Sequence, residues 1–345
     1  MKPLTLDDLP SPPQNKVGWP WTEQSEILSD RMPDGSEWPR ISIVTPSYNY
    51  GRFIEETIRS VLLQGYPNLE YIIIDGGSTD DTIEIIKKYQ LWLTYWISEP
   101  DQGQTDAINK GFAICSGDIF TWLNADDSYN SSNTLRAIVK YYQEGYELIV
   151  GECSITDING NKDFTKQQYG RSVPVNFKEY LEFWRTPSFP QPAVFVSKTI
   201  SDSAFPLDTS LNFVMDFQFF LKVLHQNPKS IWINQEWVNF KYHGKNKTSN
   251  STLNKFKGFN EIHYVALSES SKLPFFSRFI FRNKLNCYSK LFWLINSSNG
   301  LKLKNCIFSL IRNPGLFLWP LFWKVSAKSI VGENKYLSFK RVLKK

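Results

Sequence analysis

Ile41-Ser-Ile-Val-Thr-Pro-Ser-Tyr-Asn49 is the stretch that decides the fold, together with Tyr71-Ile-Ile-Ile-Asp75 and Asp118-Ile-Phe-Thr-Trp-Leu-Asn-Ala-Asp-Asp127. Each is a short apolar run that ends abruptly in polar or acidic residues, as strands buried on both faces of a parallel sheet do. Helix-like segments separate the three runs, so the predicted order is β-α-β-α-β. Because the carboxyl ends of parallel strands open onto a ligand crevice, we expect the polar ends of the runs to meet there.

In the segments between and after these strands, the spacing of apolar and turn-forming residues predicts further helices and strands. Residues 53–64 place Ile54, Ile58, Val61 and Leu62 on one helical stripe. Ser78 or Thr79 is expected to cap the helix that follows the second strand, after a tight Gly-Gly turn. We also predict strands at 91–97, 147–151 and 229–242, a loop that feeds a strand at 187–196, helices at 135–142, 177–185 and 212–225, and a hairpin or loop at 157–175.

The chain of 345 residues is long enough for one large domain or two smaller ones. We expect an irregular arm rich in Pro and Trp at 1–40. A main α/β domain is expected at 41–270, with its halves at 41–150 and 151–270. Residues 271–345 form a distinct extension of basic and aromatic character, with helical segments.

Cysteine usage and apolar runs indicate the compartment. The four cysteines form no CxxC pair, which favours reduced thiols over a disulfide frame or a zinc site. The first residues include Asp7, Asp8 and several prolines where a signal peptide has its apolar core. No run reaches about 18 uninterrupted apolar residues, so no transmembrane helix is expected. We therefore expect a cytoplasmic protein.

Charge is divided unevenly along the chain. Residues 271–345 contain 15 Lys or Arg and one acid, Glu333, whereas the remaining residues contain 24 basic and 33 acidic side chains. Such a tail suggests an anionic partner. Its aromatic residues point to the anionic inner surface of the plasma membrane, where the protein would be peripheral, although the helical wheel of 275–294 does not divide into two clean faces. Nucleic acid is not the expected partner, and a partner protein is the remaining alternative.

Four motifs resemble those of family-2 glycosyltransferases, and among these the bacterial enzymes that build cell-surface polysaccharides. In chain order they are Thr45-Pro-Ser-Tyr-Asn49, Ile74-Asp-Gly-Gly-Ser-Thr-Asp80, Ser98-Glu-Pro-Asp-Gln-Gly-Gln104 and Trp122-Leu-Asn-Ala-Asp-Asp127. With later matches near Asp216 and His243, the resemblance covers roughly residues 41–250. It implies a GT-A fold with a mostly parallel nucleotide-binding sheet, flanked by helices.

A divalent cation, Mn²⁺ or Mg²⁺, is the cofactor that the resemblance implies. Hard cations prefer carboxylate oxygens, and a cation neutralises a departing nucleoside diphosphate. Asp126 matches the metal ligand of the family's DxD motif, with Asp127 as a possible helper, and His243 matches a later ligand or phosphate contact. The chain departs from many relatives at Asn124, where they have Asp. The alternative for Asp126 or Asp127 is a helix N-cap.

The nucleotide-sugar site is implied in the same way. Pro46 and Tyr48 would frame the base, and Asp75 would accept hydrogen bonds from the base or ribose. Tyr48 as a core residue and Asp75 as a turn-stabilising residue are the alternatives. Relatives often have a second acid where this chain has Gly76. The loop at 101–109 resembles the segment that lines the donor pocket, and its matching residues are Gln104, Asp106 and Asn109, with Asp106 as a helix cap being the alternative.

The acceptor side is matched by three residues. Direct displacement at an anomeric carbon needs a base for the acceptor hydroxyl, and Asp216 matches the family's catalytic acid at the start of a helix. Gln191 matches a position that faces the acceptor or donor sugar, and Lys247 matches a position that neutralises the leaving group. An N-cap role for Asp216, a loop-structuring role for Gln191 and a surface position for His243 remain open.

The resulting prediction is an inverting glycosyltransferase. It would move a sugar from a nucleotide donor, UDP-linked, to a hydroxyl of a lipid-linked or oligosaccharide acceptor. A sugar nucleotidyltransferase would show a Gly-rich, basic phosphate loop after the first strand, where this chain has Pro-Ser-Tyr-Asn. A nucleotide- or glycan-binding module without catalysis is the other alternative, and its mark would be loss of the acids.

Overall fold

The computed structural model describes residues 3–163, 174–186, 188–244, 246–247 and 252–296. The chain divides into two compact units, Met1–Ile262 and His263–Lys345. Most of the predicted C-terminal extension, residues 297–345, lies outside the described residues, as do 164–173 of the predicted hairpin region. Among the described helices, none has the length and apolar character needed to cross a bilayer.

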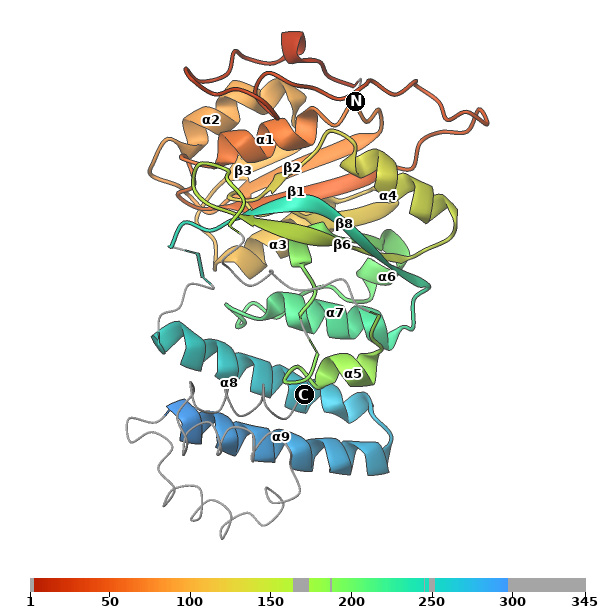
Figure 1. Ribbon diagram of the computed structural model, residues 1–345, viewed down its shortest axis with the longest axis vertical. Helices are drawn as coiled ribbons and strands as arrows, with labels where there is room; N and C mark the ends of the chain where they lie inside the picture. The colour runs from red at the N-terminus through yellow and green to blue at the C-terminus, as the bar shows by residue number, and fades with distance from the viewer. Residues whose placement is uncertain (1–2, 164–173, 187, 245, 248–251, 297–345) are drawn as a thin grey trace, which may run out of the picture. The chain divides into compact units, whose positions relative to one another are not determined.

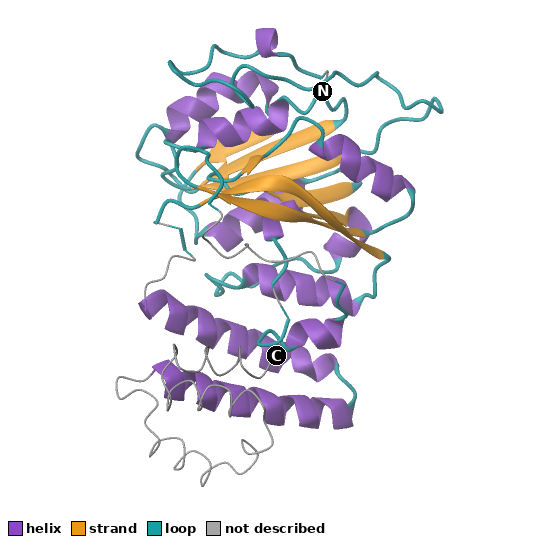
Figure 2. Cartoon of the chain, in the orientation of Figure 1, coloured by secondary structure: helices purple, strands orange, loops and turns teal. Residues whose placement is uncertain are grey.

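One mixed sheet forms the centre of the first unit (Figures 1 and 2). In the described residues its strand order is β3-β2-β1-β4-β7-β6-β8-β5. β1 to β4 are mutually parallel, β7 is antiparallel to β4 and β6, β8 is parallel to β6, and β5 is antiparallel to β8. The strands are β1 (Ile41–Ser47), β2 (Leu69–Asp75), β3 (Tyr95–Ser98), β4 (Ile119–Trp122), β5 (Ser128–Tyr129), β6 (Leu148–Thr156), β7 (Val194–Ser197) and β8 (Ser230–Lys241).

Helices cover both faces of this sheet. α1, α2 and α4 lie on one face, and α3 and α6 lie on the other (Figure 1). The α-helices are α1 (Ile54–Leu62), α2 (Thr82–Tyr89), α3 (Gln104–Ile114), α4 (Thr134–Gln143), α5 (Phe177–Leu181), α6 (Lys198–Asp202), α7 (Met215–His225), α8 (Thr252–Glu269) and α9 (Phe275–Asn296). Short 3₁₀ turns are η1 (Leu6–Asp8), η2 (Gln90–Trp92), η3 (Gln191–Ala193) and η4 (Ser270–Lys272).

The three apolar runs form the parallel strands that their pattern predicted. β1 and β2 are buried along their whole length, because helices cover both faces. Their register pairs Ser47 with Asp75, and β1 pairs Val44 with Trp122 of β4. The carboxyl ends of β1, β2 and β4 therefore reach the same edge of the sheet, which confirms the predicted α/β arrangement.

Several local expectations need correction. The strand expected at 91–97 is split into η2 and β3, the helix expected at 177–185 stops after α5, and the strand begun at 147–151 continues through β6. Neither Ser78 nor Thr79 caps α2, whose N-cap is Asp81. Ser78 instead donates its hydroxyl to Asp75 (2.5 Å), because that buried carboxylate needs donors.

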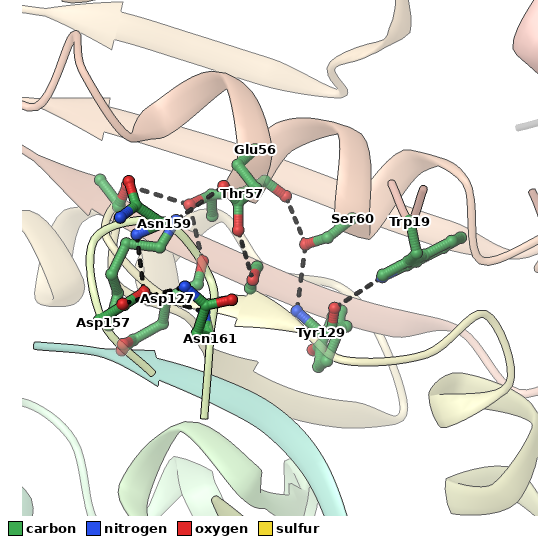
Figure 3. Close-up of polar contacts among 12 residues, drawn as sticks. Trp19, Glu56, Thr57, Ser60, Asp127, Tyr129, Asp157, Asn159 and Asn161 are labelled. Carbon is green, nitrogen blue, oxygen red and sulfur yellow. Dashed lines mark hydrogen bonds and ion pairs between the residues drawn. The ribbon is translucent and has the colours of Figure 1, made fainter. Parts of the chain in front are cut away.

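The hairpin expected after β6 begins as predicted within the described residues. Thr156 and Lys162 form an antiparallel bridge. The Asp157 carboxylate accepts hydrogen bonds from the backbone N–H of Asn159 (2.8 Å) and Asn161 (2.9 Å), which stabilises the turn between them (Figure 3).

A buried arginine helps to hold the N-terminal arm on the body. Arg59, on α1, is 0% exposed, and it donates hydrogen bonds to the carbonyl oxygens of Pro10 (2.8 Å), Pro20 (3.0 Å) and Trp21 (3.1 Å). Its guanidinium also donates to the hydroxyl of Tyr89 on α2, at 3.1 Å, and lies over the Trp21 ring. The planar guanidinium has several donors in fixed directions, so a single side chain satisfies three carbonyls of an irregular segment. The apolar residues of the arm that join the core are Leu4, Leu9, Leu28, Met32 and Trp38.

Replacing Arg59 should loosen the arm. We expect Arg59→Met to lower the free energy of unfolding by about 3 kcal/mol or more, because buried carbonyls lose their donors. Urea denaturation measures the change. Arg136→Met is the matched control, since Arg136 also contacts the arm, at Glu26, but through an exposed ion pair worth less than about 1 kcal/mol. Equal effects of the two substitutions would contradict the role of Arg59.

Candidate active site

The carboxyl ends of β1, β2 and β4 open onto a cleft of about 580 Å³. Chain segments from just before β7, around the start of α7 and after β8 complete its wall. Seven of the residues singled out in the sequence line this cleft: Pro46, Tyr48, Gln104, Asp126, Gln191, Asp216 and Lys247. The structure therefore gathers residues that are up to 201 positions apart in the chain, from Pro46 to Lys247, at one edge of the sheet.

α1 holds the chain in place where β4 ends. The hydroxyl of Thr57 lies 3.0 Å from the carbonyl oxygen of Ala125 and 2.7 Å from that of Asp127 (Figure 3). One turn further along α1, the Ser60 hydroxyl accepts a hydrogen bond from the Tyr129 N–H (3.1 Å). This backbone support fixes the direction in which the side chains of the Asn-Ala-Asp-Asp segment point.

Asp126 is the acid that faces the cleft. It is only 7% exposed, and its Oδ2 lies 3.0 Å from Nε2 of His243 and accepts a hydrogen bond from Nδ2 of Asn246 at 3.1 Å. The His243 ring stacks on Phe53 with the ring centroids 4.6 Å apart. A carboxylate and an imidazole 117 residues apart in the chain thus form one pair of potential metal donors.

Asn246 is a site residue that sequence reasoning missed. Besides its bond to Asp126, its amide donates to the Lys241 carbonyl (2.9 Å) and accepts from the His243 N–H (2.9 Å). It ties the loop after β8 to the end of β4. The only sequence signal is its place in the Gly- and Lys-rich segment that contains His243.

Asp127 does not line the cleft. It is 0% exposed, and burial, reinforced by the neighbouring Asp126, raises the pKa of its carboxyl well above the usual range. Its Oδ2 accepts a hydrogen bond from the Asn124 amide at 3.1 Å. The structure places Asp127 beneath the site, and a metal-helper role stays a prediction.

Asn124 links three parts of the cleft. Its Oδ1 accepts from Gln104 Nε2 (2.7 Å) at the start of α3, and its Nδ2 donates to Asp127. Gln191 lies within 3.5 Å of the same Nδ2 and donates to the Trp122 carbonyl (2.8 Å). An amide at position 124 supplies a donor to a buried acid where an aspartate would add a third negative charge.

At the end of β2, Asp75 stabilises the turn and Gly76 lines the cleft. Asp75 is 0% exposed and accepts hydrogen bonds from the backbone N–H of Ser78 (2.8 Å) and the Ser98 hydroxyl (2.7 Å), as the turn-stabilising alternative required. Gly76 lines the cleft, and a Cβ built on it would lie 2.8 Å from Oδ2 of Asp101. Asp101 therefore brings a carboxylate against Gly76 in the cleft wall.

Asp101 is a second cleft residue that sequence reasoning missed, although it lies within the motif at residues 98–104. Burial raises the pKa of its carboxyl, opposed by a hydrogen bond from the Gly103 N–H and supported by the charges of Asp106 and Asp75. The approach of Asp101 to Gly76 could not be read from the sequence, because these residues are 25 positions apart in the chain.

Asp106 and Asn109 face away from the cleft lining. Asp106, in the first turn of α3, accepts from the Gln102 N–H (3.2 Å) and lies 3.5 Å from Lys110. The Asn109 side chain exchanges two hydrogen bonds with the backbone of Leu207 (2.9 and 2.8 Å). Both hold loops, and the structure does not bring them to the predicted nucleotide-sugar pocket.

Asp216 lies in the first turn of α7 and lines the cleft. Burial raises the pKa of its carboxyl to about 6, against the opposing hydrogen bond from the Phe217 N–H (2.8 Å). Its neighbours Met215 and Phe217 are buried, so the surroundings are apolar. A carboxylate with such a pKa is a stronger base than an exposed one and is still ionised at neutral pH.

Lys247 and Tyr48 border the cleft on its outer side. The Lys247 ammonium donates to Oε1 of Gln104 (3.1 Å) and to the Asn212 carbonyl (3.4 Å). Desolvation lowers its pKa, although the charges of Glu261 and Asp101 oppose the shift. Tyr48 is 58% exposed, which excludes the core alternative and leaves its ring accessible from the cleft.

The comparisons with known proteins agree with this architecture. Residues 42–200 match the family model described as Glycosyl transferase family 2. An uncharacterised glycosyltransferase of Haemophilus influenzae is 30% identical over 228 residues, which cover 64% of this chain and 84% of that protein. The chain belongs to glycosyl transferase family 2.

Other relatives in the family match over shorter stretches. An uncharacterised glycosyltransferase of Mycobacterium tuberculosis is 36% identical over 103 residues, which cover 30% of this chain and 39% of that protein. The GalNAc(5)-diNAcBac-PP-undecaprenol beta-1,3-glucosyltransferase of Campylobacter jejuni is 28% identical over 148 residues, covering 41% of this chain and 48% of that one. The similarity therefore spans less than half the length of these two relatives.

Two solved structures share the fold of this family-2 glycosyltransferase. S. aureus TarS 1–349 in complex with UDP has a TM-score of 0.53 at 18% identity, covering 75% of this chain and 72% of that one. The mannosyltransferase PcManGT from Pyrobaculum calidifontis, in complex with GDP-Man and Mn²⁺, has a TM-score of 0.51 at 16% identity, covering 92% and 91%. The GT-A prediction from the sequence is thus confirmed at the level of the fold.

Replacing Asn124 with aspartate tests whether the amide limits charge repulsion with the buried Asp127. We expect Asn124→Asp to lower the free energy of unfolding at pH 8 by about 1–3 kcal/mol, because the new carboxylate faces the buried Asp127. The loss should shrink at pH 4, where protonation removes the repulsion. Thermal denaturation at both pH values checks this. Asn133→Asp is the control, since Asn133 is an exposed N-cap of α4 where an acid is favourable.

Asp216 should make stability depend on pH in a defined direction. Its folded pKa of about 6 lies above the ordinary 3.8, so the folded state retains the proton longer, and ionisation above that range destabilises the fold. We expect Asp216→Asn to raise the melting temperature relative to wild type at pH 7.5 and to have little effect at pH 4. Asp157→Asn should do the opposite at pH 7.5, because hydrogen bonds lower the pKa of Asp157. A pH-independent effect of Asp216→Asn would contradict the assignment.

Proposed function

We propose that this protein is an inverting glycosyltransferase that moves a sugar from a UDP-sugar to a hydroxyl of a lipid-linked or oligosaccharide acceptor, in the synthesis of cell-surface polysaccharide. The observation that carries the proposal is that Asp126 and Asp216 line one cleft at the carboxyl ends of parallel strands. Asp126 is suited to the diphosphate side, and Asp216 is suited to proton removal.

The donor would lie along the strand ends. Pro46, near the end of β1, and Tyr48, just after it, would frame the base in the cleft wall. The carboxylate of Asp101, beside Gly76, would accept hydrogen bonds from the base or ribose. The similar fold of TarS is solved with UDP, which supports a uridine nucleotide in this cleft. Lys247 would approach the diphosphate, since its ammonium is held by two neutral oxygens and has lost part of its hydration.

A divalent cation would be held at Asp126. The carboxylate of Asp126 and the imidazole of His243 lie 3.0 Å apart, and a hard cation held there would take further oxygens from diphosphate and water. When bound, the cation would neutralise charge on the leaving diphosphate. PcManGT is solved with Mn²⁺, which supports Mn²⁺ or Mg²⁺ for this chain. Asn246 orients the carboxylate from the other side.

Asp216 would remove the proton from the attacking hydroxyl. Its raised pKa, to about 6, places it near the pH at which such a base is most effective. A single displacement assisted by one base inverts the anomeric centre. Gln191, between the ends of β4 and β7, would contact the sugar that is transferred or received.

Lipid-linked acceptors reside at a membrane, and α9 has a suitable surface. Phe275 (83% exposed), Phe276 (73%), Phe279 (59%) and Ile280 (43%) present apolar side chains, while Phe281 and Leu285 on the same helix are buried. Arg282 and Lys290 on this helix are exposed. Aromatic residues with interspersed cations favour the anionic inner surface of a membrane. The name of the Campylobacter relative includes an undecaprenol-linked acceptor, which supports this partner class.

Nucleotide binding by calorimetry is the direct test. UDP, GDP and dTDP are each titrated with Mn²⁺, Mg²⁺ or EDTA into wild type, Asp126→Ala and the exposed control Asp30→Ala. We expect UDP to bind in the presence of a cation, and Asp126→Ala to weaken it about tenfold or more through loss of a charge-assisted ligand. Asp30→Ala should bind as wild type does.

Two results would contradict the proposal in different ways. UDP binding that is unaffected by EDTA would remove the cation from Asp126 and His243. Binding of none of the three nucleotides would favour a glycan-binding module without catalysis.

A further inference from the structure

A second recess, of about 770 Å³, adjoins the cleft. We call it the α8 recess, because α8 supplies one side of it through Asn254, Lys257, Asn260 and Glu261. The other side consists of Asn212, Phe213, Asn246 and Lys247, and all four also line the cleft. The two hollows therefore share a wall, and every residue of that wall lies in the first compact unit.

Hydrogen bonds build this shared wall. Oε2 of Glu261 accepts from the backbone N–H of Asn212 (3.0 Å) and of Phe213 (2.7 Å). Gly258 of α8 lies against Phe213, where a Cβ built on the glycine would be in ordinary van der Waals contact, 3.6 Å from Cβ of Phe213. The Glu261 carboxylate thus holds the backbone segment that leads directly into Asp216. This contact keeps the recess at a fixed position relative to the proposed base.

A third contact joins α8 to the loop after β8. Nδ2 of Asn254 donates to the Lys247 carbonyl at 3.3 Å. Lys247 in turn reaches Gln104 and Asn212. The wall is therefore tied to α3, to α8 and to the segment before α7.

The lining of the α8 recess has the chemistry of a sugar site. Asparagine amides carry a donor and an acceptor on one group, which matches the hydroxyls of a sugar ring, and the exposed amides are those of Asn212 and Asn260. The half-buried ring of Phe213 offers an apolar surface for the C–H face of the ring. Lys257 is exposed beside them, and the acid of the recess, Glu261, is occupied by backbone donors.

The recess lies away from the strand ends of the cleft. Its lining contains no residue of β1, β2 or β4, whose ends frame the donor in the proposed function. It meets the cleft at Asn212 and Phe213, just before Asp216 in the chain, and at Asn246 and Lys247, after β8. An acceptor whose reacting hydroxyl lies at Asp216 would extend into this recess.

We propose that the α8 recess binds the second sugar of an oligosaccharide acceptor, the one next to the sugar that receives the transferred unit. The inference rests on the proposed function and deepens it, because it requires an acceptor glycan of at least two sugars. Acceptor selection then depends on α8, which lies beyond residues 42–200 matched by the family model.

The test compares disaccharides with their terminal monosaccharides on the UDP-saturated protein. Cellobiose with glucose, lactose with galactose, and chitobiose with N-acetylglucosamine are titrated by ligand-observed NMR. We expect at least one disaccharide to bind about tenfold tighter than its non-reducing monosaccharide, as two added hydrogen bonds would produce. The double substitution Lys257→Ala with Asn260→Ala should abolish this preference, and Lys255→Ala should retain it, because Lys255 is exposed on the same helix outside the recess.

The possible outcomes separate the two proposals. Equal binding of every disaccharide and its monosaccharide by wild type, or no binding of any of them, overturns the α8 recess as a sugar site. A preference that survives the double substitution also overturns it. UDP binding is measured on the same samples, and its absence contradicts the proposed function, whereas intact UDP binding without a disaccharide preference contradicts only this inference.

Discussion

The constraint on which the structure depends is the parallel pairing of β1 with β2 and β4. Parallel strands with helices on both faces are buried along their length, so polar side chains appear only where each strand ends. The register pairs Ser47 with Asp75 and ends β4 two residues before Asn124. One edge of the sheet therefore collects the polar ends of all three runs, and the cleft, Asp126 and the nucleotide side of the proposed site follow from that geometry.

Burial and neighbouring amides give the carboxylates around the cleft different environments. Asp126 faces the cleft, Asp127 lies beneath it with a raised pKa, and Asn124 donates a hydrogen bond to Asp127. Across the cleft, Asp216 is held in apolar surroundings that also raise its pKa. The acids thus have different environments, and different environments are what allow neighbouring carboxylates to take different chemical roles.

Local patterns predicted much of the fold and part of the site. The apolar runs, the α1 stripe and the strand-end acids all reflect interactions between residues close in sequence, so their consequences are visible without coordinates. Three contributions were not visible in this way. Arg59 binds carbonyls from the distant arm, Asn246 reaches Asp126 from the loop after β8, and Asp101 takes the space beside Gly76. Each depends on a contact between segments whose separation in sequence carries no periodic signal.

By itself the sequence determined the fold class, the parallel strands and the acids at their ends, because burial on both faces requires continuous apolar runs and the crevice requires polar termini. Only the tertiary structure decided which of those polar residues share the cleft. It turned Asp75 and Asp106 toward hydrogen-bond donors outside the cleft and Asn109 toward the backbone of Leu207, and it brought Asp216 and Lys247 to the cleft. The physical reason is that a side chain's direction depends on the hydrogen bonds that distant segments offer it, and those exist only once the chain has folded.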